Sequence, residues 1–310
     1  MNTQMNRMPE SYRDPRTSDP QAIAPAQRLY WSVRRELWEA RSIYVAPLAA
    51  AVVFLLGFLF STIRLPAKMR SLSALDPGQQ RQVIALPYDM AAGLIMVTAL
   101  FVGVFYCLDA LYGERRDRSI LFWKSLPVSD LTTVISKASI PLVILPLLTV
   151  VISVAMQFIM LLLSSAVLIG NGLSVGAYWT QLSFIQMSLL LIYHLVTVHA
   201  LWHAPIYGWL LLVSAWARRA AFLWAALPPL TIYAVEKVVF NTSHFAAMLD
   251  YRLSGGGMEA ITGPDSFPMD PMTYLTPGKF LTSPGLWLGL AAFAAFLAGA
   301  ARLRRYQGPI

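Results

Sequence analysis

Three histidines lie close together in one apolar stretch of the sequence: His194, His199 and His203. An imidazole can carry a proton, accept a hydrogen bond or bind a metal ion. On a regular helix His199 and His203 share a face, whereas His194 lies about 140° round the axis from His199. Polar groups at membrane depth usually face a bundle interior or a wet cavity. The histidines are therefore either hydrogen-bonded packing residues or the proton-sensitive lining of a translocation path.

A carboxylate, Glu236, precedes Lys237 near the end of a second apolar stretch. Adjacent residues point about 100° apart on a helix, so these two charges do not pair easily with each other. Two interpretations stay open, a position at the membrane interface and a gate. We take His194, His199 and Glu236 as the candidates for a translocation path.

The sequence predicts no catalytic, metal-binding or cofactor-binding residues in this chain. The single cysteine, Cys107, and the lack of a His-Glu-x-x-His motif leave no complete set of zinc ligands. Gly278-Lys279 is not a phosphate-binding loop, because Thr273 stands where its first glycine is required and Phe280 where Ser or Thr is required. A nucleotide would have to bind another chain.

The composition is that of a membrane protein. Apolar residues make up 57% of the 310 residues and charged residues 13%, where soluble domains carry about 25%. A spanning helix requires about 20 predominantly apolar residues. Segments of this kind lie near 43–63, 90–112, 140–168, 182–203, 220–240 and 286–303. The predicted fold class is therefore all-α, an integral membrane bundle of six transmembrane helices.

The distribution of basic residues predicts the orientation. With the N-terminus in the cytoplasm, 17 of the 24 Lys and Arg residues fall in cytoplasmic segments, as the positive-inside rule favours. Both termini are then cytoplasmic. The first outside loop goes against the rule, since it contains Arg64, Lys68, Arg70 and Arg81.

One stretch, residues 206–217, is too short to cross alone and follows Pro205. It is either an interfacial helix or a kinked extension of the fourth span.

The remaining segments complete the domain organisation. Residues 1–26 are polar and show no periodicity, which predicts a disordered cytoplasmic tail. Residues 27–41 are typical of an amphipathic helix in the cytoplasmic interface. Its apolar positions are Tyr30, Trp31, Val33, Leu37 and Trp38. The transmembrane domain occupies 42–305, and its outside loop, 241–283, is too rich in Gly and Pro for an independent domain.

The densest polar motif, in residues 113–130, directly follows the second span. Mixed charges from Glu114 to Arg118 precede the apolar run Ile120-Leu121-Phe122-Trp123, which ends before Pro127. Two cations would suffice to hold a helix end in the cytoplasm, and water disfavours such an apolar run. The segment therefore predicts a docking site for another protein, unless its apolar side chains dip into lipid.

Residues Glu114 to Ser129, Glu-Arg-Arg-Asp-Arg-Ser-Ile-Leu-Phe-Trp-Lys-Ser-Leu-Pro-Val-Ser, resemble the cytoplasmic segment of bacterial ABC transporter type-2 permeases. The tract from Pro205 to Arg219 and the six-span layout are similar to the same family, over about residues 27–305. In that family the segment forms a coupling helix that contacts the ATP-binding subunit. The coupling residues that the resemblance implies are Glu114, Arg115, Arg116, Asp117, Arg118, Phe122, Trp123 and Lys124.

The resemblance implies a permease subunit of an ATP-driven exporter, working by alternating access in the bacterial inner membrane. Its partners would be cytoplasmic ABC ATPase subunits, a second permease chain that is identical or related, and membrane lipids, with no nucleic acid. ATP and Mg would bind in the partner ATPase, and this chain would not itself be an enzyme. Two alternatives stay open: an ion-coupled secondary transporter, which requires buried carboxylates or broken helices near the midplane, and a membrane-embedded lipid-modifying enzyme that uses the histidines.

Overall fold

The computed structural model describes residues 24–72, 75–125, 128–254 and 276–310, which form helices without any strand. The first half contains α1 Pro25–Glu39, α2 Ser42–Thr62, α3 Leu65–Leu72, α4 Pro77–Ala110, α5 Tyr112–Arg116, α6 Ile120–Ser125, α7 Asp130–Ser139, η1 Ile140–Ile144 and α8 Leu145–Gly170. The second half contains α9 Gly176–Gln181, α10 Phe184–His194, η2 Leu195–Trp202, α11 Ala204–Trp216, α12 Ala221–Val235, η3 Glu236–Phe240, α13 His244–Leu253, α14 Pro277–Thr282 and α15 Pro284–Tyr306. The predicted all-α class is confirmed. Most of the predicted tail and the middle of the outside loop lie outside the described residues.

In the part of the chain that the structure describes, six helices are long and apolar enough to cross a membrane, as the sequence predicted. Their bounds are Ser42–Thr62, Pro77–Arg116, Asp130–Gly170, Tyr178–Trp202, Ala221–Phe240 and Pro284–Tyr306. The second and third are 40 and 41 residues long, about twice what a bilayer requires. Both therefore extend beyond their apolar segments, the second through residues 77–89 and the third through α7.

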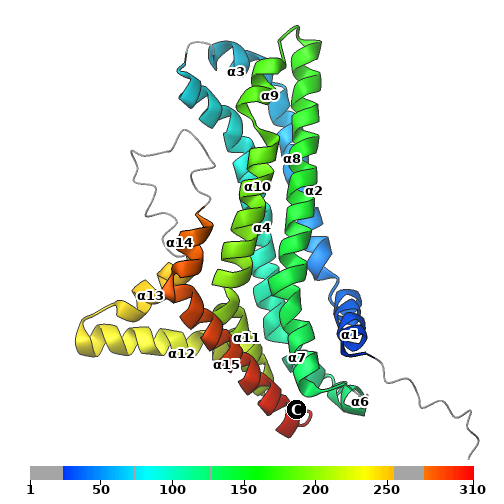
Figure 1. Cartoon of the computed structure of the whole chain (residues 1–310), viewed down its shortest axis with the longest axis vertical. Coiled ribbons are helices and arrows are strands. Elements are labelled where there is room, and N and C mark those ends of the chain that lie inside the picture. The colour runs from blue at the N-terminus through cyan, green and yellow to red at the C-terminus, as the bar shows by residue number, and fades with distance from the viewer. Residues whose placement is uncertain (1–23, 73–74, 126–127, 255–275) are drawn as a thin grey trace, which may run out of the picture.

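Helices α2, α4 and α8 run alongside one another through the long axis of the molecule (Figure 1). Their shared core includes Ile95 of α4 with Met156 and Met160 of α8, all fully buried. Residues four apart on a helix lie on one face, so the two methionines form part of a continuous apolar stripe. Burial of this stripe holds the three helices together.

Residues 206–217 were predicted to form either an interfacial helix or an extension of the fourth span, and most of them lie in α11. Only His203 separates it from η2, and it packs against α4 and α15. Its Tyr207 and Leu211 are fully buried in a core shared with those helices. Helix α11 is therefore a packed continuation of the fourth span.

Helix α12 turns away from the bundle. Ala220, with a left-handed φ of 48°, makes the turn between α11 and α12. Helix α12 then runs across the long axis of the bundle (Figure 1). Within α12 and η3 only Ala221 and Ala225 are buried, although nearly all the side chains are apolar. Such a helix requires lipid or another chain around it.

The two ends of the bundle carry different elements. Helices α3 and α9 lie at one end, and α1, α6 and the C-terminus lie at the other (Figure 1). We call these the α3 end and the α6 end. The positive-inside rule predicts that the α6 end faces the cytoplasm and the α3 end faces the outside.

Candidate functional site at the α6 end

The predicted coupling segment forms a bent elbow, which we define as residues 113–125. The chain turns between the short helices α5 and α6 at Arg118, whose φ of 58° lies in the left-handed region. Ser214 of α11 accepts hydrogen bonds from the backbone N–H groups of Leu111 and Tyr112, at 3.0 and 2.9 Å. This hydroxyl satisfies amide groups where α4 ends and α5 begins, so α11 fixes the start of the elbow.

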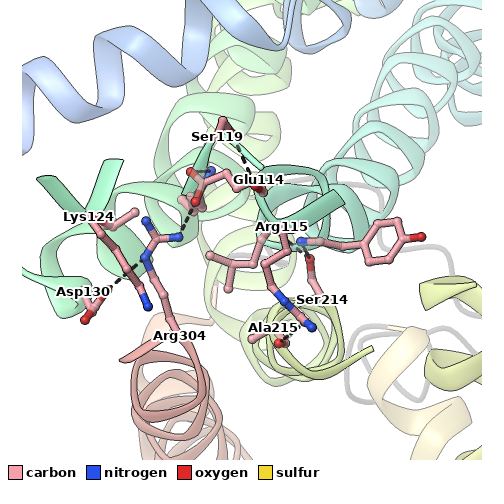
Figure 2. Close-up of polar contacts among 12 residues, drawn as sticks. Glu114, Arg115, Ser119, Lys124, Asp130, Ser214, Ala215 and Arg304 are labelled. Atoms are coloured by element: carbon pink, nitrogen blue, oxygen red, sulfur yellow. Dashed lines mark hydrogen bonds and ion pairs between the residues drawn. The ribbon is translucent and has the colours of Figure 1, made fainter. Parts of the chain in front are cut away.

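Glu114 lies on the inner side of the elbow, 7% exposed, and its carboxylate contacts three cations. Lys137 Nζ lies 3.0 Å from Glu114 Oε1, and Arg35 Nη2 lies 3.3 Å from the same oxygen. Arg304 pairs with Oε2 and also reaches Asp130, whose Oδ1 is 3.1 Å from Arg304 Nε (Figure 2). The charge of this buried carboxylate is therefore compensated from several helices, as burial requires.

Glu36 of α1 is a second buried carboxylate at the same place. Lys137 Nζ donates to both of its oxygens, at 3.0 and 3.1 Å, and the Tyr106 hydroxyl donates to Oε2 at 2.8 Å. Burial raises the pKa of Glu36, but the charges of Lys137 and Arg35 lower it by more, so the pKa lies below the ordinary value. The carboxylate is therefore ionised at neutral pH.

These charged groups form one ionic cluster from elements far apart in the sequence. Its members are Arg35, Glu36, Glu114, Asp130, Lys137 and Arg304. Three are acidic and three are basic, so the formal charges balance. Since a buried charge without its partner is costly, the cluster fixes α1, α5, α7 and α15 relative to one another.

Arg115 also points inward, toward the end of α11. Its Nη1 donates to the carbonyl oxygens of Ala215 and Ala217, at 2.5 and 3.1 Å (Figure 2). The last carbonyls of a helix have no partner within the helix, and a cation there also complements the helix dipole. Arg115 therefore joins the elbow to the C-terminal end of α11.

The outer face of the elbow combines charged and apolar side chains. Arg116, Asp117 and Arg118 are exposed, and Leu121 and Phe122 are 59% and 60% exposed. Ile120 of the same apolar run is buried. Two of the four residues of the run, Leu121 and Phe122, are thus available to lipid or to another protein.

Trp123 and Lys124 attach α6 to the rest of the α6 end. The Arg35 guanidinium carbon lies 3.9 Å from the centre of the Trp123 ring, a distance typical of a cation–π contact. Lys124 Nζ donates to the backbone oxygens of Arg305 and Gln307, at 3.4 and 3.0 Å. The tip of the elbow is therefore connected to α1 and to the C-terminal end of α15.

Six of the eight predicted coupling residues fall into two groups, and the other two, Trp123 and Lys124, attach α6 to α1 and α15. Glu114 and Arg115 are buried and hold the elbow from within, so their side chains do not belong to its outer face. Arg116, Asp117, Arg118 and Phe122 lie on that face, where docking stays a prediction.

Five members of the ionic cluster were not predicted as site residues: Arg35, Glu36, Asp130, Lys137 and Arg304. One signal was present, because Lys137 interrupts an apolar run and a cation in such a position requires a partner. The partner Glu36 is 101 residues away in the sequence, so spacing could not identify it.

The three histidines form a column at the π-helix η2. The ring centres of His194 and His199 are 6.1 Å apart, and those of His199 and His203 are 5.5 Å apart. The expectation that His194 points away from His199 is wrong. A π-helical turn joins residues five apart, so it brings these two onto one face.

His199 and His203 each form one hydrogen bond through a ring nitrogen. His199 Nε2 donates to Met96 O at 3.1 Å, and His203 Nε2 donates to Leu253 O at 3.3 Å. The Nδ1 atoms of both rings are buried and have no hydrogen-bond partner among the described residues. Among the described residues no group of three or more His, Cys, Asp or Glu is placed to hold a metal ion. The observed contacts are therefore those of hydrogen-bonded packing histidines, and a translocation path stays a prediction.

Glu236, the third candidate for that path, accepts hydrogen bonds at the start of α13. The donors are Thr242 Oγ1 at 2.9 Å and the backbone N–H groups of His244 and Phe245 at 2.6 and 2.8 Å. The first amides of a helix lack partners within it, so Glu236 caps α13. A role in a translocation path stays a prediction and would require the carboxylate to leave these donors.

Comparisons of this chain with protein-family models, curated proteins and solved structures found no match. The resemblance to type-2 permeases therefore rests on the residues of this sequence.

Proposed function

We propose that this chain is the permease subunit of an ATP-driven exporter of the ABC type-2 kind, in a bacterial inner membrane with both termini in the cytoplasm. The observation that carries the proposal is the elbow, which has an exposed tip and is joined to the helix bundle by the ionic cluster at Glu114. Leu121 and Phe122 are side chains of the kind that fill a cleft on a partner protein. Arg116 and Asp117 beside them would set the orientation of that partner.

The contacts on the inner side of the elbow would transmit a movement of α6 to the helices of the bundle. Glu114 connects it to α7 and α15, Trp123 connects it to α1, and Arg115 connects it to α11. A partner ATPase that binds ATP and Mg and then closes would pull on α6, and the attached helices would move with it. Tilting of the spans would expose a central path, with His194 and His199 as candidate lining, alternately to the two sides.

A second permease chain would find an unpartnered apolar surface on α12. Leu230 is 58% exposed in the middle of this helix. The one native cysteine, Cys107, is buried. A Leu230→Cys variant would therefore report on a neighbouring chain with little background, through disulfide-linked dimers formed in native membranes.

The central experiment is purification of the chain from its own membranes in a mild detergent. We expect a P-loop ATPase to copurify and to hydrolyse ATP faster with this subunit than without it. Leu121→Asp and Phe122→Asp should abolish the copurification, because they place a charge at the proposed contact. Phe240→Asp is the matched control, since Phe240 is 68% exposed in η3, far from the elbow in the sequence.

Retention of the ATPase by both elbow variants would overturn the proposal, as would a membrane preparation from which no ATPase copurifies. Glu114 is unsuitable for this test, because its buried ion pairs make any substitution a test of folding.

A further inference from the structure

The α3 end contains a cleft that the proposed function does not use. It lies between α2, α3 and α4, with Tyr178 of α9 at one side, and has a volume of about 500 Å³. Pockets that bind small molecules typically measure about 300–1,000 Å³. The cleft is therefore large enough for part of a lipid-sized ligand.

The interior of the cleft is apolar. Phe58 of α2, Leu72 of α3 and Ile84 of α4 are buried side chains that line it. Phe60, Leu65, Met69, Val83 and Pro87 add to the apolar lining. An apolar surface of this kind favours a hydrocarbon chain over a polar solute.

Two exposed cations, Arg64 and Lys68, lie on the lining of the same cleft. They are four residues apart across the start of α3, a spacing that brings side chains together on a helix. Lys68 Nζ donates to Val83 O at 3.3 Å, across the cleft from α3 to α4. Within the described part of the chain neither cation forms an ion pair with a carboxylate.

The same two cations go against the positive-inside rule, since the sequence assigns the α3 end to the outside. An anion bound between them would offset their charge at this end of the bundle. Paired cations above an apolar cleft match a molecule with an anionic head and a hydrocarbon chain, because Arg and Lys bind phosphate oxygens through charge-assisted hydrogen bonds.

We infer that the cleft between α2, α3 and α4 binds one anionic phospholipid, with its phosphate between Arg64 and Lys68 and an acyl chain along Phe58 and Ile84. This site lies at the opposite end of the bundle from the elbow (Figure 1). Its occupation requires neither ATP nor a partner ATPase, so binding can be tested apart from the proposed transport.

The test uses the full chain, purified in a neutral detergent and depleted of lipid, with thermal unfolding as the readout. Phosphatidylglycerol, phosphatidylcholine and inorganic phosphate are titrated separately. We expect saturable stabilisation by phosphatidylglycerol, much weaker stabilisation by phosphatidylcholine and none by phosphate. The double variant Arg64→Gln/Lys68→Gln should weaken phosphatidylglycerol binding about 25-fold, or about fivefold for each cation removed. Arg70→Gln, on the same helix but not on the lining, should keep the affinity.

Three outcomes would overturn the inference. Equal binding of phosphatidylglycerol and phosphatidylcholine would mean that the charge of the head group does not contribute to recognition. Stabilisation by inorganic phosphate alone would assign the cations to a small anion. Unchanged phosphatidylglycerol affinity in the double variant would show that the lipid binds elsewhere on the bundle.

Discussion

Lys137 of α7 and Glu36 of α1 face each other at 3.0 Å inside the protein, and their side chains are only 2% and 3% exposed. Helix α1 lies outside the six candidate spans, whereas α7 begins the third, so this pair attaches the predicted interfacial helix to the bundle. A buried ion pair adds little stability relative to a well-packed apolar pair, but removal of one partner leaves a buried charge uncompensated. Single and double variants should therefore behave differently.

The first prediction concerns these variants. Lys137→Met removes the cation that both Glu36 and Glu114 contact, and it should lower the free energy of unfolding by about 3–5 kcal/mol. Glu36→Leu/Lys137→Met should recover part of this loss, since it removes one of the two buried carboxylates that lose the Lys137 charge. Thermal unfolding in one detergent, followed by tryptophan fluorescence, measures both.

Glu39→Leu is the matched control for that comparison. Glu39 lies on the same helix and pairs with Arg35 at 3.6 Å, but its side chain is 49% exposed. An exposed pair of this kind contributes about 0–1 kcal/mol. If Lys137→Met destabilised the protein no more than Glu39→Leu, the buried ionic cluster would not exist in the folded state.

The second prediction is that acid weakens the contribution of Glu36. Its folded-state pKa is below the ordinary value, so the unfolded chain binds this proton more tightly than the folded protein does. The stability from this group is complete above the unfolded pKa of about 4.3 and is lost as the pH falls through the folded pKa. The stability difference between the wild type and Glu36→Gln should therefore be constant from about pH 8 to 6 and should shrink below about pH 4. Growth of this difference in acid would contradict the assigned direction of the pKa shift.

The six spans were predictable because an uninterrupted apolar run of sufficient length almost decides a membrane helix by itself. The first span agrees closely, at 43–63 from the sequence and Ser42–Thr62 in the structure. The second begins at Pro77 instead of residue 90. Residues 77–89 contain polar side chains and are held by packing of Ile84 and Tyr88, which a hydropathy pattern does not report.

The ionic cluster and the histidine column were not predictable in the same way. The cluster depends on pairs such as Glu114 and Arg304, 190 residues apart, which only the folded chain brings together. The column depends on a π-helical turn, and a regular helix assumed from the sequence places His194 on a different face from His199. Hydrophobic periodicity therefore located the elements, while tertiary contacts decided which polar groups meet.

The third prediction tests the close approach of α11 and α15. A Cβ atom at Gly208 would lie 2.8 Å from a Phe293 ring carbon and 3.3 Å from the Phe296 Cβ atom. Gly208→Ala should lower the free energy of unfolding by about 1–3 kcal/mol, the usual cost of overpacking a core. Gly57→Ala is the control, since a Cβ there meets nothing within 4 Å and alanine favours a helix by about 1 kcal/mol. Equal effects of the two substitutions would mean that the helices are not in contact at Gly208.

The fourth prediction concerns the turn of the elbow at Arg118. Its φ of 58° is left-handed, a conformation that costs an L-residue about 1–2 kcal/mol and that glycine adopts freely. Arg118→Gly should therefore preserve the turn, whereas Arg118→Val should strain it, because a β-branched residue disfavours positive φ. Both variants remove the same charge, so their difference isolates the backbone.

Limited proteolysis of the elbow and thermal unfolding measure this difference, and we expect Arg118→Val to be less stable than Arg118→Gly by about 1–2 kcal/mol. Arg118→Asn should resemble the glycine variant, since asparagine tolerates the left-handed region. If only the turn is required for docking, the glycine and asparagine variants retain the partner and the valine variant loses it. Loss of the partner in all three would assign the docking contribution to the Arg118 charge, and identical stability of all three would mean that the chain does not turn at this residue.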